Sequence, residues 1–171
     1  MIQPGNAMTN ISTCDLCDTH KADNTDNFRV LPPVFPSFGG VQKFSGMVST
    51  VKCFEDNTSV KQALEEPGAG RVLVVDGAAS LCRALVGGNI AAVAAKNGWA
   101  GVVVNGCVRD GAELATTPLG IRALALMPLP TLRRAEGERD AAVQIQGVWV
   151  RAGDWLYADE DGIVVSAVKL H

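Results

Sequence analysis

Two short apolar runs separated by an alanine-rich stretch constrain the fold of this chain more than any other feature. The first run, residues 71–76, reads RVLVVD, and the second, residues 101–104, reads GVVV. Each run is continuous, which is typical of a strand covered on both faces. Residues 89–97 between them are rich in alanine and are followed by Gly98, as a helix often is. The pattern predicts a strand, a crossover helix and a second, parallel strand.

Turn-forming residues divide the rest of the chain into short elements. Ser12 or Thr13, followed by acidic residues, indicates the start of a helix, and Pro67-Gly68 ends another helix over 59–66. Further strands are expected at 44–54, 121–126, 143–145, 148–150, 154–158 and 163–168. Loops are expected at 31–40, 77–89, 105–111 and 129–140. The fold class is therefore α/β, with a mixed sheet that contains a parallel βαβ unit.

Length and composition limit the number of domains, the classes of partner and the cellular location that we expect. The chain has 171 residues, of which 47% are hydrophobic, so one domain over residues 13–171 is expected. Its 18 acidic and 15 basic residues give a net charge of −3, which argues against nucleic acid as a partner. No apolar run approaches the roughly 20 residues that span a bilayer, and no secretory signal is recognisable. Five cysteines, an odd number, favour reduced thiols and a cytoplasmic location.

The amino-terminal residues stand apart from this domain. Pro4 and Gly5 precede a second methionine, Met8, and no periodic pattern begins before Ser12. Residues 1–12 are expected to be disordered, or to be a remnant of cloning or an alternative start.

The most informative segment for chemistry is NGCVRD, residues 105–110, where charged residues follow a buried strand. Arg109 offers a planar fork suited to a carboxylate, and Asp110 offers a hard oxygen suited to Mg²⁺ or Mn²⁺. An isolated Arg-Asp pair is most often a surface ion pair. Here, however, the Gly87-Gly88 turn precedes the crossover helix, and the topology places it at the same sheet edge. Its backbone amides form a natural anion cradle.

Several separated blocks of the sequence resemble one known family. GGNIAAVAAKNGWAGVVVNGCVRD, residues 87–110, is similar to the signature of the regulator of ribonuclease E activity A family, which also contains the 4-hydroxy-4-methyl-2-oxoglutarate aldolases. TCDLCD, FSGMVSTVKCFEDN, GRVLVVDGAAS and GDWLYADEDGIVVS extend the resemblance over nearly all of residues 13–168. It implies a swivelling β/β/α domain and a homotrimer with the site near a subunit boundary.

The resemblance also implies roles for individual residues. The glycine-rich turn of the aldolases, which holds the pyruvate portion of the substrate, maps onto Gly87, Gly88, Asn89 and Ile90. The substrate-binding arginine corresponds to Arg109 and the metal-binding aspartate to Asp110. One position departs from the aldolases: they have an aspartate that positions metal-bound water where this chain has Gly88.

Two functions follow as expectations. The first is a carbon–carbon lyase that depends on a divalent metal and acts on 2-oxo acids, by oxaloacetate decarboxylation, by aldol cleavage that releases pyruvate, or by both. Decarboxylation demands less of the site, because it needs an electron sink but no base to remove a hydroxyl proton. The alternative is a non-catalytic protein that binds ribonuclease E and regulates it. The retention of Arg109 and Asp110 favours the enzyme.

Overall fold

The structure is a computed structural model that describes residues 12–171. The expectation for residues 1–11 therefore lies outside the described residues. Ser12 caps the first helix, because its hydroxyl accepts a hydrogen bond from the backbone N–H of Asp15. The helices of the described part are α1 (Thr13–His20), α2 (Thr58–Glu65), α3 (Gly88–Lys96) and α4 (Gly111–Thr116).

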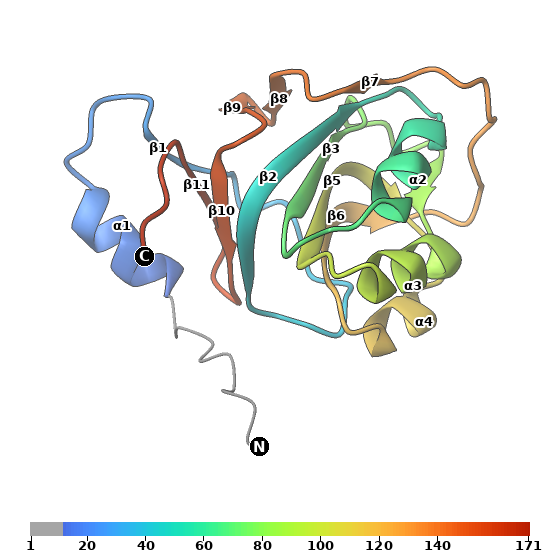
Figure 1. Cartoon of the computed structure of the whole chain (residues 1–171), viewed down its shortest axis with the longest axis horizontal. Helices are drawn as coiled ribbons and strands as arrows, with labels where there is room; N and C mark the ends of the chain where they lie inside the picture. Colours follow the sequence, from blue (N-terminus) through green and yellow to red (C-terminus); the bar gives the residue numbers. More distant parts are fainter. Residues whose placement is uncertain (1–11) are drawn as a thin grey trace.

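The strands form one large mixed sheet and one separate hairpin (Figure 1). The main path of the large sheet runs β1 (Phe28–Val30), β11 (Ile163–Ser166), β10 (Trp155–Ala158), β2 (Phe44–Lys52), β3 (Val72–Asp76), β5 (Gly101–Val108) and β4 (Ala84–Val86). Two further strands pair beside this path, β6 (Gly120–Leu126) with β5 and β7 (Glu138–Arg139) with β2. The hairpin consists of β8 (Val143–Ile145) and β9 (Val148–Val150). The expected mixed α/β class is thus confirmed.

The parallel half of the sheet contains the predicted βαβ unit. Strands β3 and β5 are parallel neighbours, and α3 lies between them in the chain. Parallel pairing continues from β3 to β2 and from β5 to β4 and β6. Every residue of β5 is buried, which explains why its apolar residues are continuous and do not alternate. The antiparallel strands β1, β11 and β10 extend the sheet on the far side of β2.

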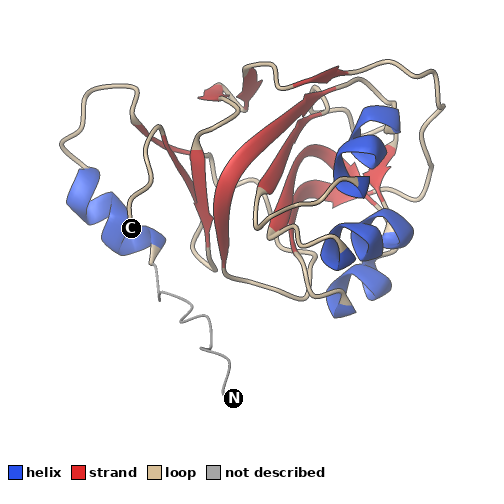
Figure 2. Ribbon diagram, in the orientation of Figure 1, coloured by secondary structure: helices blue, strands red, loops and turns tan. Residues whose placement is uncertain are grey.

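Two apolar clusters cover the two faces of the parallel strands. Helices α2, α3 and α4 lie together over one face (Figure 2). There Leu64 and Leu114 belong to one buried cluster with Leu73 of β3. On the other face, Val74 of β3 packs with Ile145 and Val150 of the hairpin. Each such buried side chain contributes on the order of 1.5–3 kcal/mol relative to an exposed one.

The strand β5 runs further than the sequence predicted. A loop was expected from residue 105, but the strand continues through Asn105 and Gly106 to Val108. The Asn105 side chain remains in the sheet because Asp76 and Gln146 satisfy its amide. The register of the β5–β6 pair shifts between Val104 and Cys107, so the glycine marks an irregularity inside the strand.

Other short elements were not predicted. Strand β4 lies inside the expected loop 77–89, and β7 inside the expected loop 129–140. Strand β1 and helix α4 had no periodic signal, because each is short and takes its stability from pairing or packing. Among residues 12–171, the structure contains no helix long and apolar enough to cross a membrane.

Candidate functional site

The end of β5 delivers Arg109 and Asp110 to the carboxyl edge of the parallel strands. The backbone N–H of Arg109 donates to the carbonyl of Val86, which ties the end of β5 to β4. Asp110 then adopts a left-handed conformation, with φ 63°, and immediately precedes α4. Aspartate tolerates this conformation better than most residues. In an extended strand, the side chains of adjacent residues point to opposite sides. The turn redirects the chain immediately after Arg109, so the side chains of Arg109 and Asp110 need not do so.

The Asp110 carboxylate contacts the glycine turn directly. The N–H of Gly88 donates to Oδ2 of Asp110 at 2.8 Å. Gly88 is the first residue of α3, so the carboxylate lies at the positive end of the helix dipole. The two segments that the sequence placed at one sheet edge are therefore in contact, although they are 22 positions apart.

Side chains are excluded from the glycine turn by its neighbours. A β-carbon added to Gly87 would lie 2.8 Å from Oδ2 of Asp110 and 3.2 Å from Cγ of Arg109. A β-carbon added to Gly88 would overlap the carboxylate of Glu113, which belongs to α4. The space that a side chain at position 88 would take is thus filled by a carboxylate from the neighbouring helix.

A small cavity of about 110 Å³ opens beside these residues. Its lining includes the predicted residues Gly87, Asn89, Ile90, Arg109 and Asp110. The backbone N–H groups of the first turn of a helix have no acceptor within the helix. Asn89 and Ile90 belong to the first turn of α3 and line the cavity, so their N–H groups have no acceptor within the helix.

The rest of the cavity wall was not predicted. It is formed by Asn57, Ala84, Pro130, Thr131 and Arg133. The segment 129–140 had been predicted as a surface loop without a role in the site. The sequence did carry one signal, the cationic pair Arg133-Arg134, but nothing in it indicated where this segment folds back. The lining of the cavity therefore includes two arginines, Arg109 and Arg133, and one acid, Asp110.

Asp56 attaches this wall to the domain. Its carboxylate accepts hydrogen bonds from the backbone N–H groups of Arg134 and Glu136, and from both the N–H and the hydroxyl of Thr58. Burial acts to raise the pKa of Asp56, but these hydrogen bonds outweigh it and lower the pKa to about 2. The carboxylate is therefore ionised at neutral pH and keeps Arg133 beside the cavity.

The acidic groups limit the kind of metal that the site can hold. Within residues 12–171, no cluster of three or more His, Cys, Asp or Glu side chains could enclose a metal ion. Asp110 is the acid that lines the cavity, and its Oδ1 accepts no hydrogen bond from the described residues. Mg²⁺ is commonly bound through one or two carboxylates, with water and substrate oxygens completing its shell. The donors present fit such a loosely held, hard cation.

Comparison with known proteins agrees with this architecture. A family model described as RraA-like, Aldolase/RraA, matches residues 13–165. A protein of Albidiferax ferrireducens named "Putative 4-hydroxy-4-methyl-2-oxoglutarate aldolase" is 65% identical over 167 residues, which is 93% of this chain and 96% of the relative.

Solved structures show the same fold. The RNA-processing inhibitor RraA from Thermus thermophilis is 45% identical and superposes with a TM-score of 0.88, over 94% of this chain and 95% of the other. An S-adenosylmethionine:2-dimethylmenaquinone methyltransferase from Geobacillus kaustophilus is 41% identical, with a TM-score of 0.85 over 94% and 97% of the two chains.

Proposed function

The chain belongs to the RraA-like family, and from this membership and the geometry of the site we propose that it is a carbon–carbon lyase for small 2-oxo acids. The observation that carries the proposal is the contact of Asp110 with the amino terminus of α3, beside Arg109, in a cavity that holds little more than a small acid. The aldolase name of the relative that is 65% identical supports the same class of reaction.

The proposed substrate is a dicarboxylic 2-oxo acid such as oxaloacetate. The guanidinium of Arg109 binds one carboxylate in a bidentate manner. The N–H groups of Asn89 and Ile90, at the positive end of α3, are further donors to the same group. Arg133, which also lines the cavity, attracts the second carboxylate.

The proposed metal is Mg²⁺ or Mn²⁺, and Asp110 would hold it. When bound, such an ion supplies a Lewis acid that polarises the 2-oxo group. Arg109 holds the substrate carboxylate next to this group and stabilises the negative charge that develops as the bond to the departing carboxylate breaks. Because Asp110 is exposed, solvent reaches the cavity and supplies the proton that converts the enolate to pyruvate.

Aldol cleavage of 4-hydroxy-4-methyl-2-oxoglutarate demands one more group. A base must remove the hydroxyl proton, and in the aldolases that this chain resembles, an aspartate at the position of Gly88 organises this transfer. Here the carboxylate of Glu113 lies against Gly88, so the negative charge next to this position belongs to α4 and not to α3. We expect this cleavage to be slower than decarboxylation.

The test is direct. Purified protein is mixed with oxaloacetate and Mg²⁺ or Mn²⁺, and pyruvate is followed with a coupled lactate dehydrogenase assay. Free divalent cations decarboxylate oxaloacetate slowly, so a control with metal alone is subtracted. A rate well above this control supports the proposal, and a rate equal to it with both cations rejects the decarboxylase.

A second candidate function rests on a different comparison. The Thermus thermophilis neighbour, described as an RNA-processing inhibitor, is 45% identical over nearly the whole chain. A non-catalytic protein that binds and inhibits ribonuclease E would act through its surface and would not need the cavity. Inhibition of purified ribonuclease E that persists in Asp110→Ala, without any 2-oxo acid turnover by the wild type, would favour this function.

A further inference from the structure

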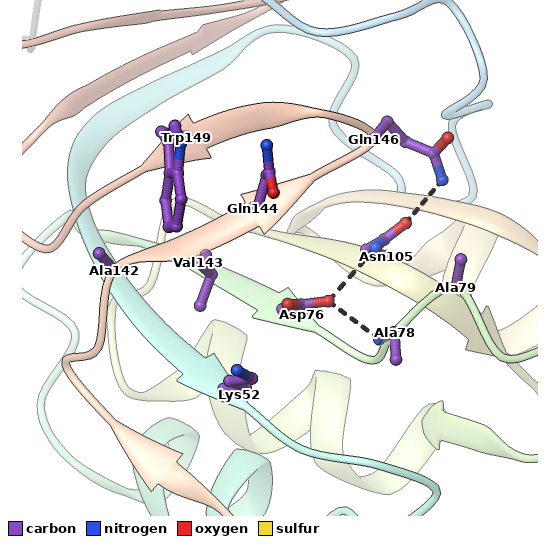
Figure 3. A pocket seen from close by; sticks show the side chains of 10 residues that line it. All are labelled: Lys52, Asp76, Ala78, Ala79, Asn105, Ala142, Val143, Gln144, Gln146 and Trp149. Atoms are coloured by element: carbon purple, nitrogen blue, oxygen red, sulfur yellow. Dashed lines mark hydrogen bonds between the residues drawn. The ribbon is translucent and has the colours of Figure 1, made fainter.

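A row of polar side chains crosses three neighbouring parallel strands on the face that the hairpin covers. Lys52 of β2 is in register with Asp76 of β3, and Asp76 is in register with Asn105 of β5. Side chains in register point to the same face of a sheet. Figure 3 shows the three together beneath β8 and β9.

This row and residues of the hairpin line a cavity of about 440 Å³. The hairpin contributes Val143, Gln146 and the half-exposed indole of Trp149 to its walls. This cavity shares no lining residue with the one that contains Arg109. It is therefore a separate hollow, and what it binds is independent of the proposed lyase activity.

Hydrogen bonds fix the floor of the cavity (Figure 3). Gln146 donates its side-chain N–H to Oδ1 of Asn105 at 2.9 Å, and Asn105, only 4% exposed, donates its own amide N–H to Oδ1 of Asp76 at 3.3 Å. The backbone N–H of Ala78 donates to the same carboxylate oxygen at 2.9 Å. The other oxygen, Oδ2 of Asp76, accepts no hydrogen bond from residues 12–171. Hydrogen bonds to Oδ1 thus hold the Asp76 carboxylate in place, while Oδ2 can accept a hydrogen bond from a ligand.

The backbone beside Asp76 is held in an unfavourable conformation. Ala78 and Ala79 both have φ 56°, in the left-handed region that alanine rarely adopts. The N–H groups of Gly77 and Ala79 both donate to the carbonyl of Asn105, which keeps this turn against β5. Strain of this kind persists only where the surrounding structure imposes it, and it is concentrated at functional sites.

Two opposite charges in this row stand side by side without forming an ion pair. No salt bridge within residues 12–171 involves Lys52 or Asp76. Glu138 of β7 is in register with Lys52 on its other side, and it lines an adjoining hollow that Lys52 and Asp76 also border, but it does not line this cavity. The cavity therefore presents one ammonium and one carboxylate, each available to a ligand.

From this arrangement we infer that the cavity binds a free α-amino acid with an uncharged, apolar side chain. The ligand's carboxylate pairs with Lys52, and its ammonium group pairs with Oδ2 of Asp76. Its side chain lies against Trp149, whose half-exposed indole supplies apolar, aromatic surface. A simple anion would be repelled by Asp76 and a simple amine by Lys52, so the zwitterion is the complementary ligand.

Isothermal titration calorimetry with three matched probes tests the inference on the full chain. L-leucine carries both charges, 3-methylbutylamine lacks the carboxylate, and 4-methylpentanoate lacks the ammonium group. We expect L-leucine or another apolar L-amino acid to bind, and the corresponding amine and acid to bind at least about tenfold more weakly. Asp76→Asn and Lys52→Met should each weaken amino-acid binding by a similar factor.

Matched variants separate this site from general effects of charge and from the proposed active site. Asp18→Asn and Lys96→Met remove the same charges from exposed positions elsewhere and should bind as the wild type does. Arg109→Ala should also bind normally, whatever its effect on lyase activity. The inference is overturned if no apolar L-amino acid binds up to about 10 mM, if the amine or the acid binds as tightly as the amino acid, or if Asp76→Asn and Lys52→Met bind unchanged.

Discussion

Arg109 and Asp110 are adjacent in the sequence but interact with different parts of the molecule. Arg109 is half-buried at the end of β5, and its guanidinium lies 3.5 Å from the carbonyl of Pro128. Asp110 is exposed and binds the N–H of Gly88. The left-handed turn at Asp110 nevertheless leaves both residues in the lining of one cavity. The pair could be singled out from the sequence by its place after a buried strand, but its contact with Gly88 depends on how β5 and α3 pack.

Substitution of the two charged residues should separate binding from metal dependence. We expect Arg109→Ala to lower kcat/KM for oxaloacetate about 10²-fold, because a donor to the developing negative charge is lost. Asp110→Ala should reduce the rate to that of free metal ions. Steady-state pyruvate formation is the measurement, and Arg151→Ala, at an exposed arginine paired with Asp26, is the control. Wild-type rates in Asp110→Ala would show that this carboxylate does not hold the metal.

The glycine at position 88 offers a second test at this scale. Gly88→Asp would push the side chain of Glu113 away, which is tolerable because the carboxylate is the far end of a flexible side chain. We expect it to raise the cleavage of 4-hydroxy-4-methyl-2-oxoglutarate relative to oxaloacetate decarboxylation, because a carboxylate then stands at the aldolase position. Gly88→Ala displaces Glu113 without adding a charge and should not raise this ratio. Equal ratios in the two variants would mean that displacement alone explains any change.

Helices and strands could be predicted from the sequence where local pattern and packing agree. The apolar residues of β3 and the alanine-rich α3 are examples, because a continuous apolar run and a terminal glycine are local signals. The predicted end of β5 was wrong for a non-local reason. Asn105 resembles a strand-ending residue, but Gln146, 41 positions away, satisfies its amide and allows the strand to continue. Only the folded structure shows that partner.

The wall segment 129–140 depends on Asp56, and this dependence should vary with pH. The pKa of Asp56 is lowered from 3.8 to about 2 on folding, so the carboxylate stabilises the fold above about pH 4. This contribution, about 2 kcal/mol, is lost as the pH falls through about 2. We expect Asp56→Asn to unfold at lower urea concentration at pH 7, with the difference from wild type shrinking towards pH 2. Asp161→Asn, at an exposed aspartate, is the control. An equal loss of stability in that variant would contradict the role given to Asp56.

For the whole molecule, the site could be located only in part from the sequence. The rule that parallel strands bring their carboxyl ends to one edge correctly placed the glycine turn beside Arg109. It could not place Arg133, which reaches the cavity through a long segment without regular structure for most of its length. The larger cavity over Asp76 also escaped prediction, because it depends on where the hairpin β8–β9 folds.

The border of the proposed active site leads to a prediction about assembly. Leu126, Leu129 and Leu132 are 52%, 48% and 48% exposed, and they lie on the segment that runs from β6 into the cavity wall. Exposed apolar side chains gathered next to a site are typical of a protein interface. We predict a homotrimer in which a second copy covers this segment. Its mass by light scattering should be about three times the 17.9 kDa of the chain.

A charge introduced at this border should break the trimer and weaken the site together. We expect Leu129→Glu to give the mass of a monomer, since an interface cannot bury an unpaired carboxylate without a large cost in free energy. Lyase activity should fall in the same variant, because Leu129 adjoins Pro130 and Thr131 of the cavity wall. Val168→Glu adds the same charge at a residue that is 60% exposed near the carboxyl end, and it should leave mass and activity unchanged. A wild type that is monomeric at micromolar concentration would contradict the assembly. If Leu129→Glu is still a trimer, the interface between the copies lies on another face, and these leucines would contact a different partner.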